Sequence, residues 1–446
     1  MAQDNKKFQQ MTTTPVEKLI CKLAIPTIFG MLITAFYNMA DTYFVGQIGT
    51  SATAAVGVSF SLMAIIQAMG FLFGQGSGNF ISRKLGAQAP KEASAMASTA
   101  FFSSLIAGVL IAAVGILFIE PLAIVLGSTE TILPYAVDYL LYVFLGAPFL
   151  IGSFVLNNQL RFQGNALYGT IGMGTGAILN IALDPIFIFV FDLGVAGASM
   201  ATTVSQIVSF VILIFMTQKK SVVPLSLKEF KPSGMLYKEM FRGGLPSLAR
   251  QGLSSVSTII LNTMAGAYGG DPAIAGMSVV TRICMFANSA VIGFGQGFQP
   301  VCGFNYGAGL YERVKKAYKF CVKVSTAFLV VAGAVLFIFA PVVIALFRKD
   351  DPEVIAIGAL ALRCQCVSMF LAGTVVMSNM MLQTIGKAVP ATIVAMSRQF
   401  IFFVPCVVIL SLCFGLVGVQ IAQAVADVLA FALTVPIAIK VMREMR

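Results

Sequence analysis

The chain has 446 residues, of which 58% are hydrophobic and only 11% are charged, and its mean hydropathy is +0.91. These values lie well outside the range of soluble globular proteins and indicate an integral membrane protein. The formal net charge of +11 would suggest a nucleic-acid partner for a soluble chain, but in a membrane protein the placement of the charges decides their meaning. We therefore expect the bilayer, and no nucleic acid, as the partner of this surface.

Apolar runs of about 20 residues, enough to cross a bilayer, recur along the whole chain. They predict an all-α membrane protein with twelve transmembrane helices and no separate soluble domain. The predicted helices cover residues 17–45, 53–80, 94–119, 132–157, 162–191, 195–217, 240–264, 273–300, 315–347, 354–382, 388–412 and 416–440.

The basic residues cluster in alternate loops between these helices. The clusters are Lys6, Lys7, Lys18 and Lys22; Arg83, Lys84 and Lys91; Lys219, Lys220, Lys228, Lys231, Lys238 and Arg242; Arg313, Lys315, Lys316, Lys319 and Lys323; and Arg443 with Arg446. Positively charged loops remain on the cytoplasmic side, so both termini are predicted to be cytoplasmic. The protein is expected to be a multi-pass component of the cytoplasmic (inner) cell membrane.

Several classes of function lack their sequence signals. Histidine is absent, which excludes His-based catalytic triads and His proton relays, and no GxxxxGK[ST] motif is present for ATP. Most of the eight cysteines lie in apolar helices, and the CxC pair of Cys364 and Cys366 has no second ligand cluster, which favours free core thiols over a metal site. The first fifteen residues are polar without a cleavage-type signal, so the helix at 17–45 is read as an uncleaved anchor. We expect neither enzymatic activity nor an organic cofactor.

The second half of the chain repeats landmarks of the first half at an offset of 220 to 222 residues. A near-constant offset over separated landmarks indicates an internal repeat. The matched positions are Ile25-Pro26 with Leu245-Pro246, Gly74-Gln75-Gly76 with Gly295-Gln296-Gly297, Gly86 with Gly307, Asn157 with Asn379, Gly164 with Gly386, and Gly194 with Gly415.

The repeat predicts three parts: an N-lobe at 1–217, a cytoplasmic linker at 218–238 and a C-lobe at 239–446. Six helices per lobe is an even number, so both lobes enter the membrane in the same sense and are related by a pseudo-two-fold axis along the membrane normal. Two such bundles create a central cleft, which is typical of secondary transporters that alternate between inward-open and outward-open states. We expect such a transporter to work as a monomer.

Proline interrupts several of the predicted helices. Pro26 and Pro185 each remove a backbone hydrogen bond and permit a bend, and Pro185 directly follows an acidic residue. Both a functional hinge and simple packing remain open for these two positions.

Two acidic residues lie inside apolar segments of the first half. Asp41 is about 6 Å and Asp184 about 10 Å from the outer ends of their helices, and Thr202 lies about 10 Å deep on the next helix. Asn180 is four residues before Asp184 and so shares its helical face. Carboxylate, amide and hydroxyl oxygens suit a small hard cation, and intramembrane acids are costly without a function. The four residues predict a site for H⁺ or Na⁺, with hydrogen-bonded helix packing as the alternative.

The second half is not equivalent. The one buried acid of the second half is Asp427, and the matching position of the first half holds Gln206. Arg282 or Arg398 is expected as a structural ion-pair partner of Asp427, and a secondary functional acid at this position is an equal alternative. Coupling is therefore assigned to the N-lobe.

Substrate contacts are harder to place. The chain has 22 methionines and 37 phenylalanines, side chains that can repack around varied ligands but that more often pack in a core or face lipid. Candidate residues for the cleft are Tyr37, Asn157, Gln163, Met31 and Met173.

In several segments the chain resembles the MATE (multidrug and toxic compound extrusion) transporters, especially the MepA-like and DinF-like branch. The resemblance rests on the segments IPTIFGMLITAFYNMADTYFVGQIG, LRFQGNA, ILNIALDPIFIF and GVAGASMATTVSQ. It implies two lobes, export of cationic or amphipathic drugs in exchange for inward H⁺ or Na⁺, and a cation site at Asp41, Asn180, Asp184 and Thr202. Acids that another branch carries on the seventh and tenth helices are missing here.

Secondary active multidrug export by alternating access is therefore the first hypothesis. The alternative is a flippase for a lipid-linked sugar or glycolipid, which needs a strongly cationic central cavity, whereas here the buried arginines are few and the N-lobe site is acidic. A membrane enzyme or receptor has no catalytic constellation to support it.

Overall fold

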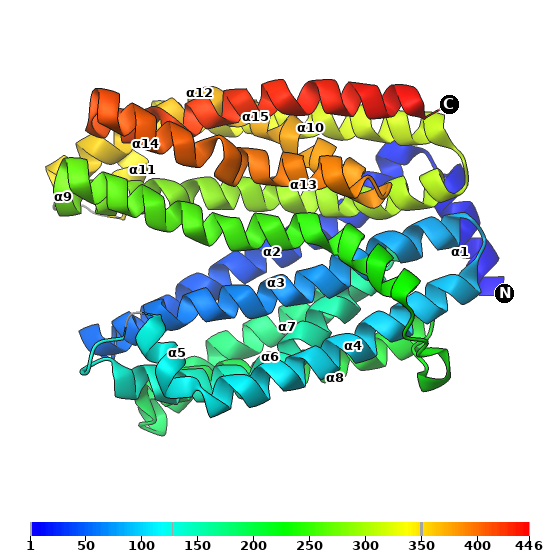
Figure 1. Ribbon diagram of the computed structural model, residues 1–446, viewed down its shortest axis with the longest axis horizontal. Coiled ribbons are helices and arrows are strands. Elements are labelled where there is room, and N and C mark those ends of the chain that lie inside the picture. The colour runs from blue at the N-terminus through cyan, green and yellow to red at the C-terminus, as the bar shows by residue number, and fades with distance from the viewer. Residues whose placement is uncertain (1, 127, 348–350, 446) are drawn as a thin grey trace.

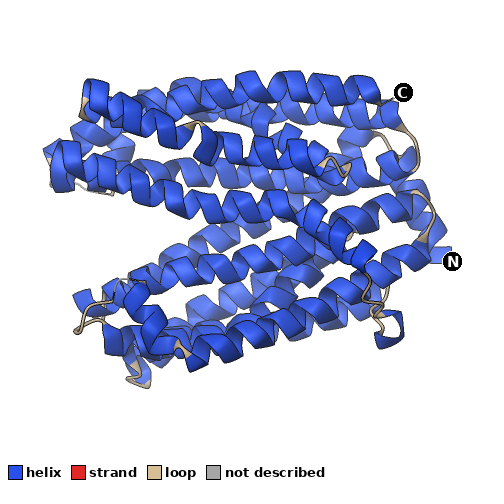
Figure 2. Ribbon diagram, in the orientation of Figure 1, coloured by secondary structure: helices blue, strands red, loops and turns tan. Residues whose placement is uncertain are grey.

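A computed structural model describes residues 2–126, 128–347 and 351–445. In this part of the chain helices are joined by short loops, and Figure 2 contains no strand. The elements are α1 (Ala2–Thr13), α2 (Val16–Gly46), α3 (Thr50–Gly86), α4 (Pro90–Leu117), α5 (Ile119–Val125), α6 (Leu133–Phe162), α7 (Ala166–Pro185), η1 (Ile186–Val190), α8 (Gly194–Lys220), η2 (Leu227–Glu229), α9 (Gly234–Gly307), α10 (Tyr311–Ile338), α11 (Ala340–Ala345), α12 (Pro352–Thr384), α13 (Ala388–Met396), η3 (Ser397–Ile401), α14 (Phe403–Phe414) and α15 (Leu416–Glu444).

The membrane-spanning helices agree with the prediction from hydropathy. Among the described residues, 11 helices are long and apolar enough to cross a membrane. One of them, α9, has 74 residues and is interrupted at Gly270, whose φ of 62° and ψ of −159° are not helical. Since α9 therefore contains two crossings, the described residues hold the twelve crossings expected from the sequence.

The helices form two lobes (Figure 1). Helices α2 to α8 make up one layer, and α9 to α15 the other, which confirms the predicted two-lobe fold. Both chain termini lie at one end of the molecule, where the lobes meet, and the ribbons diverge toward the opposite end. We call these the terminal end and the distal end, and the facing sides of the two lobes the interlobe region.

Glycine permits the close approach of the lobes at the terminal end. A Cβ atom on Gly76 of α3 would collide with the backbone carbonyl of Met240 on α9, and one on Gly244 of α9 would collide with that of Leu72 on α3. Two backbones in such contact leave no space for any side chain, so these glycines are required by the packing.

The internal repeat is visible in the backbone. Four left-handed positions recur at an offset of 221 or 222 residues: Gly49 with Gly270, Gln88 with Gly309, Gly164 with Gly386, and Gly194 with Gly415. Two amide side chains at the same offset also make the same bond, since Asn157 donates to the carbonyl of Gly169 at 3.1 Å and Asn379 to that of Ala391 at 2.6 Å. The two lobes therefore share turns and interhelical hydrogen bonds as well as helix order.

The N-terminal segment, which the sequence indicated only as polar, forms the helix α1. The side chain of Met11 is fully buried, and the Nζ atom of Lys7 donates to the carbonyl of Gly164 at 2.8 Å and to Oδ1 of Asn165 at 2.9 Å. Burial, together with the charge of Lys22, lowers the pKa of Lys7 to about 8. The helix is thus docked onto the turn between α6 and α7.

Proline has different effects in α2 and α7. Helix α2 continues through Pro26, whose carbonyl accepts a hydrogen bond from the hydroxyl of Thr170 at 3.1 Å. Helix α7 ends at Pro185, and the chain continues as the π-helical segment η1. A hinge function at either proline stays a prediction.

Candidate cation-binding site

Close packing of α7 on α8 brings the predicted polar residues of the N-lobe together. A Cβ atom on Gly176 of α7 would lie 3.0 Å from the carbonyl of Ser205 and 2.8 Å from the Cβ of Ser209, both on α8. One and two turns further along α7, Asn180 and Asp184 are 1% and 0% exposed. The glycine thus allows the two polar side chains to face α8 without solvent.

Hydrogen bonds join three of the four predicted residues. The Nδ2 atom of Asn180 donates to Oδ1 of Asp184 at 3.2 Å and to Oγ1 of Thr202 at 3.1 Å. The hydroxyl of Thr202 in turn donates to the carbonyl of Ala198 at 3.1 Å. Both N–H groups of the Asn180 amide are therefore used, and its oxygen is left over as an acceptor.

Three buried oxygen atoms at this site accept no hydrogen bond from the described part of the chain. They are Oδ1 of Asp41, Oδ1 of Asn180 and Oδ2 of Asp184. Neither acid takes part in any ion pair within the described part of the chain. Buried acceptors normally find partners, and oxygen ligands of this kind suit H⁺ or a hard cation such as Na⁺.

Helix α2 contributes Asp41 from the other side of the site. The charges of Asp41 and Asp184 lie within interaction range of each other, and Tyr37, one turn before Asp41, lies within electrostatic range of both acids. Tyr37, a predicted substrate contact, therefore lies beside the candidate cation site.

One further residue at this site was missed by the sequence analysis. Tyr139 of α6 is 1% exposed, its hydroxyl donates to the sulfur of Met63 at 3.6 Å, and it lies within electrostatic range of Asp41 and Asp184. In the sequence it stands in an apolar run and is indistinguishable from an interfacial tyrosine.

The C-lobe acid has a complete set of partners. Oδ1 of Asp427 accepts from Nε of Arg398 at 2.8 Å and from the amide of Gln423 at 2.9 Å, and Oδ2 accepts from the hydroxyl of Ser368 at 3.3 Å. Of the two arginines expected from the sequence, the structure therefore pairs Arg398 with Asp427. A paired carboxylate has no vacant oxygen comparable to those of the N-lobe site.

The remaining substrate candidates are scattered. Met31 lies between the lobes, where its sulfur accepts from Gln296 at 3.8 Å, and Met173 lies within the N-lobe next to Ser209. Asn157 uses its amide to join α6 to α7.

Gln163, another predicted substrate contact, binds the chain segment that follows α8. It is fully buried at the terminal end of α6, and its Oε1 atom accepts from the hydroxyl of Ser221 at 2.7 Å and from the backbone N–H groups of Val222 and Val223. This side chain caps the segment after α8, and its role as a substrate contact stays a prediction.

Comparison with known proteins gives consistent matches over nearly the whole chain. The MatE family model matches residues 26–186 and 246–409. The chain is 30% identical over 416 residues to "Multidrug export protein MepA" of Staphylococcus aureus, which covers 93% of this chain and 91% of that protein.

Solved structures are similar over the same extent. One is described as the outward-facing conformation of a multidrug resistance MATE family transporter of the MOP superfamily, with a TM-score of 0.93, 28% identity and 98% of both chains covered. Another is a MOP superfamily transporter from Pyrococcus furiosus for which reversed polarity of the binding pocket suggests a different function, with a TM-score of 0.92, 28% identity, and 99% of this chain and 98% of that one covered.

Proposed function

Because this chain belongs to the MatE family of membrane transporters, we propose that it exports drug-like amphiphilic compounds in exchange for H⁺ or Na⁺. The observation that carries the proposal is the set of three buried, donor-free oxygens on Asp41, Asn180 and Asp184. A protein that only needed to pack these helices would not leave two carboxylates unpaired within the membrane.

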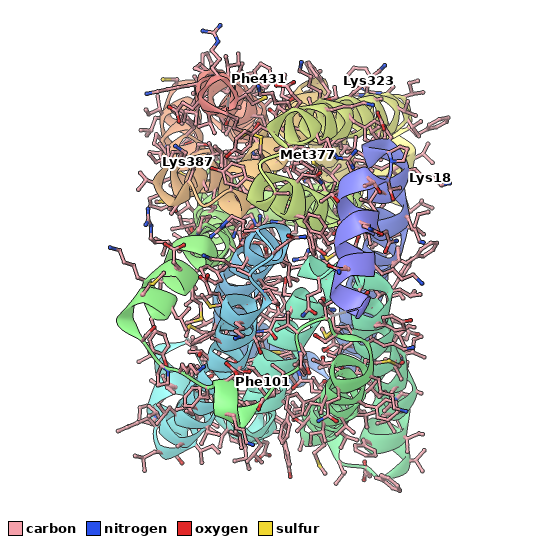
Figure 3. The ribbon with its side chains drawn as sticks, turned by 90° about the vertical axis from the view of Figure 1, so that its right-hand side faces the viewer. Lys18, Phe101, Lys323, Met377, Lys387 and Phe431 are labelled. Carbon is pink, nitrogen blue, oxygen red and sulfur yellow. The ribbon has the colours of Figure 1, made fainter. Side chains whose placement is uncertain are left out.

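The terminal end is assigned to the cytoplasm. Figure 3 looks onto this end, where Lys18, Lys323 and Lys387 are labelled, and basic residues in membrane proteins concentrate on the cytoplasmic side. The lobes are then closed toward the cytoplasm and diverge toward the outside, as in the outward-facing relative.

Helix α2 connects the cation site to the contact between the lobes. Its distal half carries Asp41, and in its terminal half the hydroxyl of Thr27 donates to the carbonyl of Gly293 in the C-lobe at 2.7 Å. A bound cation removes the repulsion between Asp41 and Asp184 and favours a closer approach of α2 to α7. Movement of α2 in turn changes its contacts with the C-lobe, which couples ion binding to the position of the lobes.

Transport in proteoliposomes tests this function. A pH gradient and a Na⁺ gradient are imposed separately, and one of the two should drive export of a fluorescent drug-like dye. The gradient that drives export identifies the coupling ion. Asp184→Asn should abolish this export, and the exposed Asp192→Asn should not. Export that is independent of both gradients would contradict the proposed exchange.

A further inference from the structure

A second buried polar cluster lies in the terminal half of the molecule and carries the opposite charge. Arg161, next to the last residue of α6, is 2% exposed. Its Nη2 atom donates to Oδ1 of Asn158 at 2.5 Å, and its guanidinium lies over the ring of Phe162 at 4.8 Å. The Nε and Nη1 atoms have no hydrogen-bond partner among the residues that the structure describes. A buried guanidinium that is not paired with an acid of the chain is costly, so its unpaired donors favour an anionic ligand.

Neighbouring residues show which way Arg161 faces. Asn157 bonds to Gly169 of α7, and Asn158 packs against Gly74 of α3, where a Cβ atom would lie 2.8 Å from the amide nitrogen. At the next turn Arg161 falls between these two directions. Its side chain is therefore directed between α3 and α7, toward the interlobe region.

The C-lobe supplies a second cation to the same region. Arg250 of α9 lies two turns from Gly243, on the same helical face, and Gly243 packs against Gly76 of α3. The charges of Arg250 and Arg161 are close enough to interact. No ion pair in the described part of the chain involves either arginine.

We propose that Arg161 and Arg250 form a subsite for an acidic group, a carboxylate, sulfonate or phosphate, on an amphiphilic substrate. This inference rests on the proposed export function and specifies its substrate class. The planar guanidinium has donors that match oxyanions, and one arginine from each lobe allows a bound anion to bridge the lobes. The acidic cation site lies in the distal half of the N-lobe, so the coupling ion and the substrate's acidic group are kept apart.

Two dyes of nearly identical shape test the subsite in proteoliposomes. Rhodamine B has a free carboxylate, whereas its ethyl ester has the same fluorophore without that charge. Wild-type protein should export both dyes. Arg250→Gln and Arg161→Gln should reduce export of rhodamine B by about tenfold to a hundredfold, the loss expected for a hydrogen bond to a charged group, and leave export of the ester within about twofold. The matched control is Arg363→Gln, because Arg363 is an exposed arginine that lies over the ring of Phe337.

The outcomes separate this inference from the exporter function. Export of the ester but not of rhodamine B by wild-type protein would overturn the subsite and leave the exporter intact. Equal losses for both dyes in both arginine variants would also overturn it, because that result indicates a structural role. If wild-type protein exports neither dye under any gradient, the proposed function fails first. Because Arg161 is fully buried, Arg250→Gln provides the decisive variant if Arg161→Gln does not fold.

A second and independent observation concerns α1. Lys7 binds the turn at Gly164 and Asn165 in the N-lobe. The residues that follow bind the C-lobe: the carbonyl of Met11 accepts from Asn305 at 3.1 Å, and that of Thr14 from Arg313 at 2.6 Å. Figure 3 shows this first helical segment at the terminal end, beside both lobes. We infer that α1 is a strap that holds the terminal end closed and that must release Lys7 before this end can open.

Spin labels on Lys91 of the N-lobe and Lys319 of the C-lobe, both exposed, report the opening of this end. Lys7→Ala should raise the population with long inter-label distances about tenfold, as expected for the loss of the two hydrogen bonds of Lys7. Lys6→Ala removes an exposed lysine of the same helix and should have no effect. Equal distance distributions in the two variants would overturn the strap, and this readout does not depend on transport.

Discussion

Asp184→Asn is the substitution that most clearly separates a functional carboxylate from a packing residue. The change keeps the shape of the side chain and the oxygen that accepts from Asn180, and it removes one negative charge that has no cationic partner. A cation about 4 Å from a carboxylate, at an effective dielectric constant near 20, gains about 4 kcal/mol from that charge. Its loss corresponds to roughly a thousandfold weaker cation binding, so coupled export should fall to background.

The same variant should fold at least as well as the wild type. Because Asp184 is fully buried and its Oδ2 has no donor within the described ranges, removal of the charge relieves a desolvation cost. Dye export in proteoliposomes and the thermal unfolding midpoint of purified protein are the two assays. Wild-type export by Asp184→Asn would refute the coupling role. A loss of export accompanied by a lower midpoint would refute the claim that the charge serves function rather than packing.

Three further predictions follow from the contacts between and within the lobes. Asp427→Asn should lower the free energy of unfolding by roughly 3 kcal/mol, because it leaves the guanidinium of Arg398 without its buried partner; chemical denaturation checks this, and an unchanged midpoint would contradict it. Gly76→Val should prevent α3 from closing on α9, since its side chain would meet a backbone carbonyl; reactivity of a cysteine introduced at the terminal end should then rise, and unchanged reactivity would count against the packing argument. Burial lowers the pKa of Lys7 from 10.5 to about 8. Between pH 8 and pH 10.5 the docked α1 therefore binds fewer protons than the released α1, so docking should strengthen as the pH rises through this range. Spin-label mobility on α1 measures this, and a pH profile that Lys7→Gln does not flatten would contradict it.

The lobes and their crossings were predictable because the signals are local and repeated. Membrane-spanning length is set by about 20 apolar residues, and the offset between the halves is carried by residues such as Gly194 and Gly415 whose backbone conformation is special. Helical spacing alone placed Asn180 and Asp184 on one face, and the structure joins them by a hydrogen bond.

Other features depend on contacts between distant parts of the chain and left no readable pattern. The docking of α1 joins Lys7 to Gly164 across 157 residues. Tyr139 comes near the acidic site only through the packing of α6. The side chain of Gln163 binds a backbone segment that lies nearly 60 residues further along, a contact that no local pattern indicates. The sequence shows which acids and arginines lie within the membrane, but only the packed helices show which groups bind to them.

Release of a cation by an incoming substrate is the most direct test of the central claim. Purified protein loaded with H⁺ or Na⁺ in weakly buffered detergent solution should release about one of these ions for each drug-like dye molecule bound, measured by a pH indicator or by ²²Na⁺. The Asp41→Asn/Asp184→Asn double variant should bind the dye and release none. Equal release from the double variant and the wild type would contradict the account.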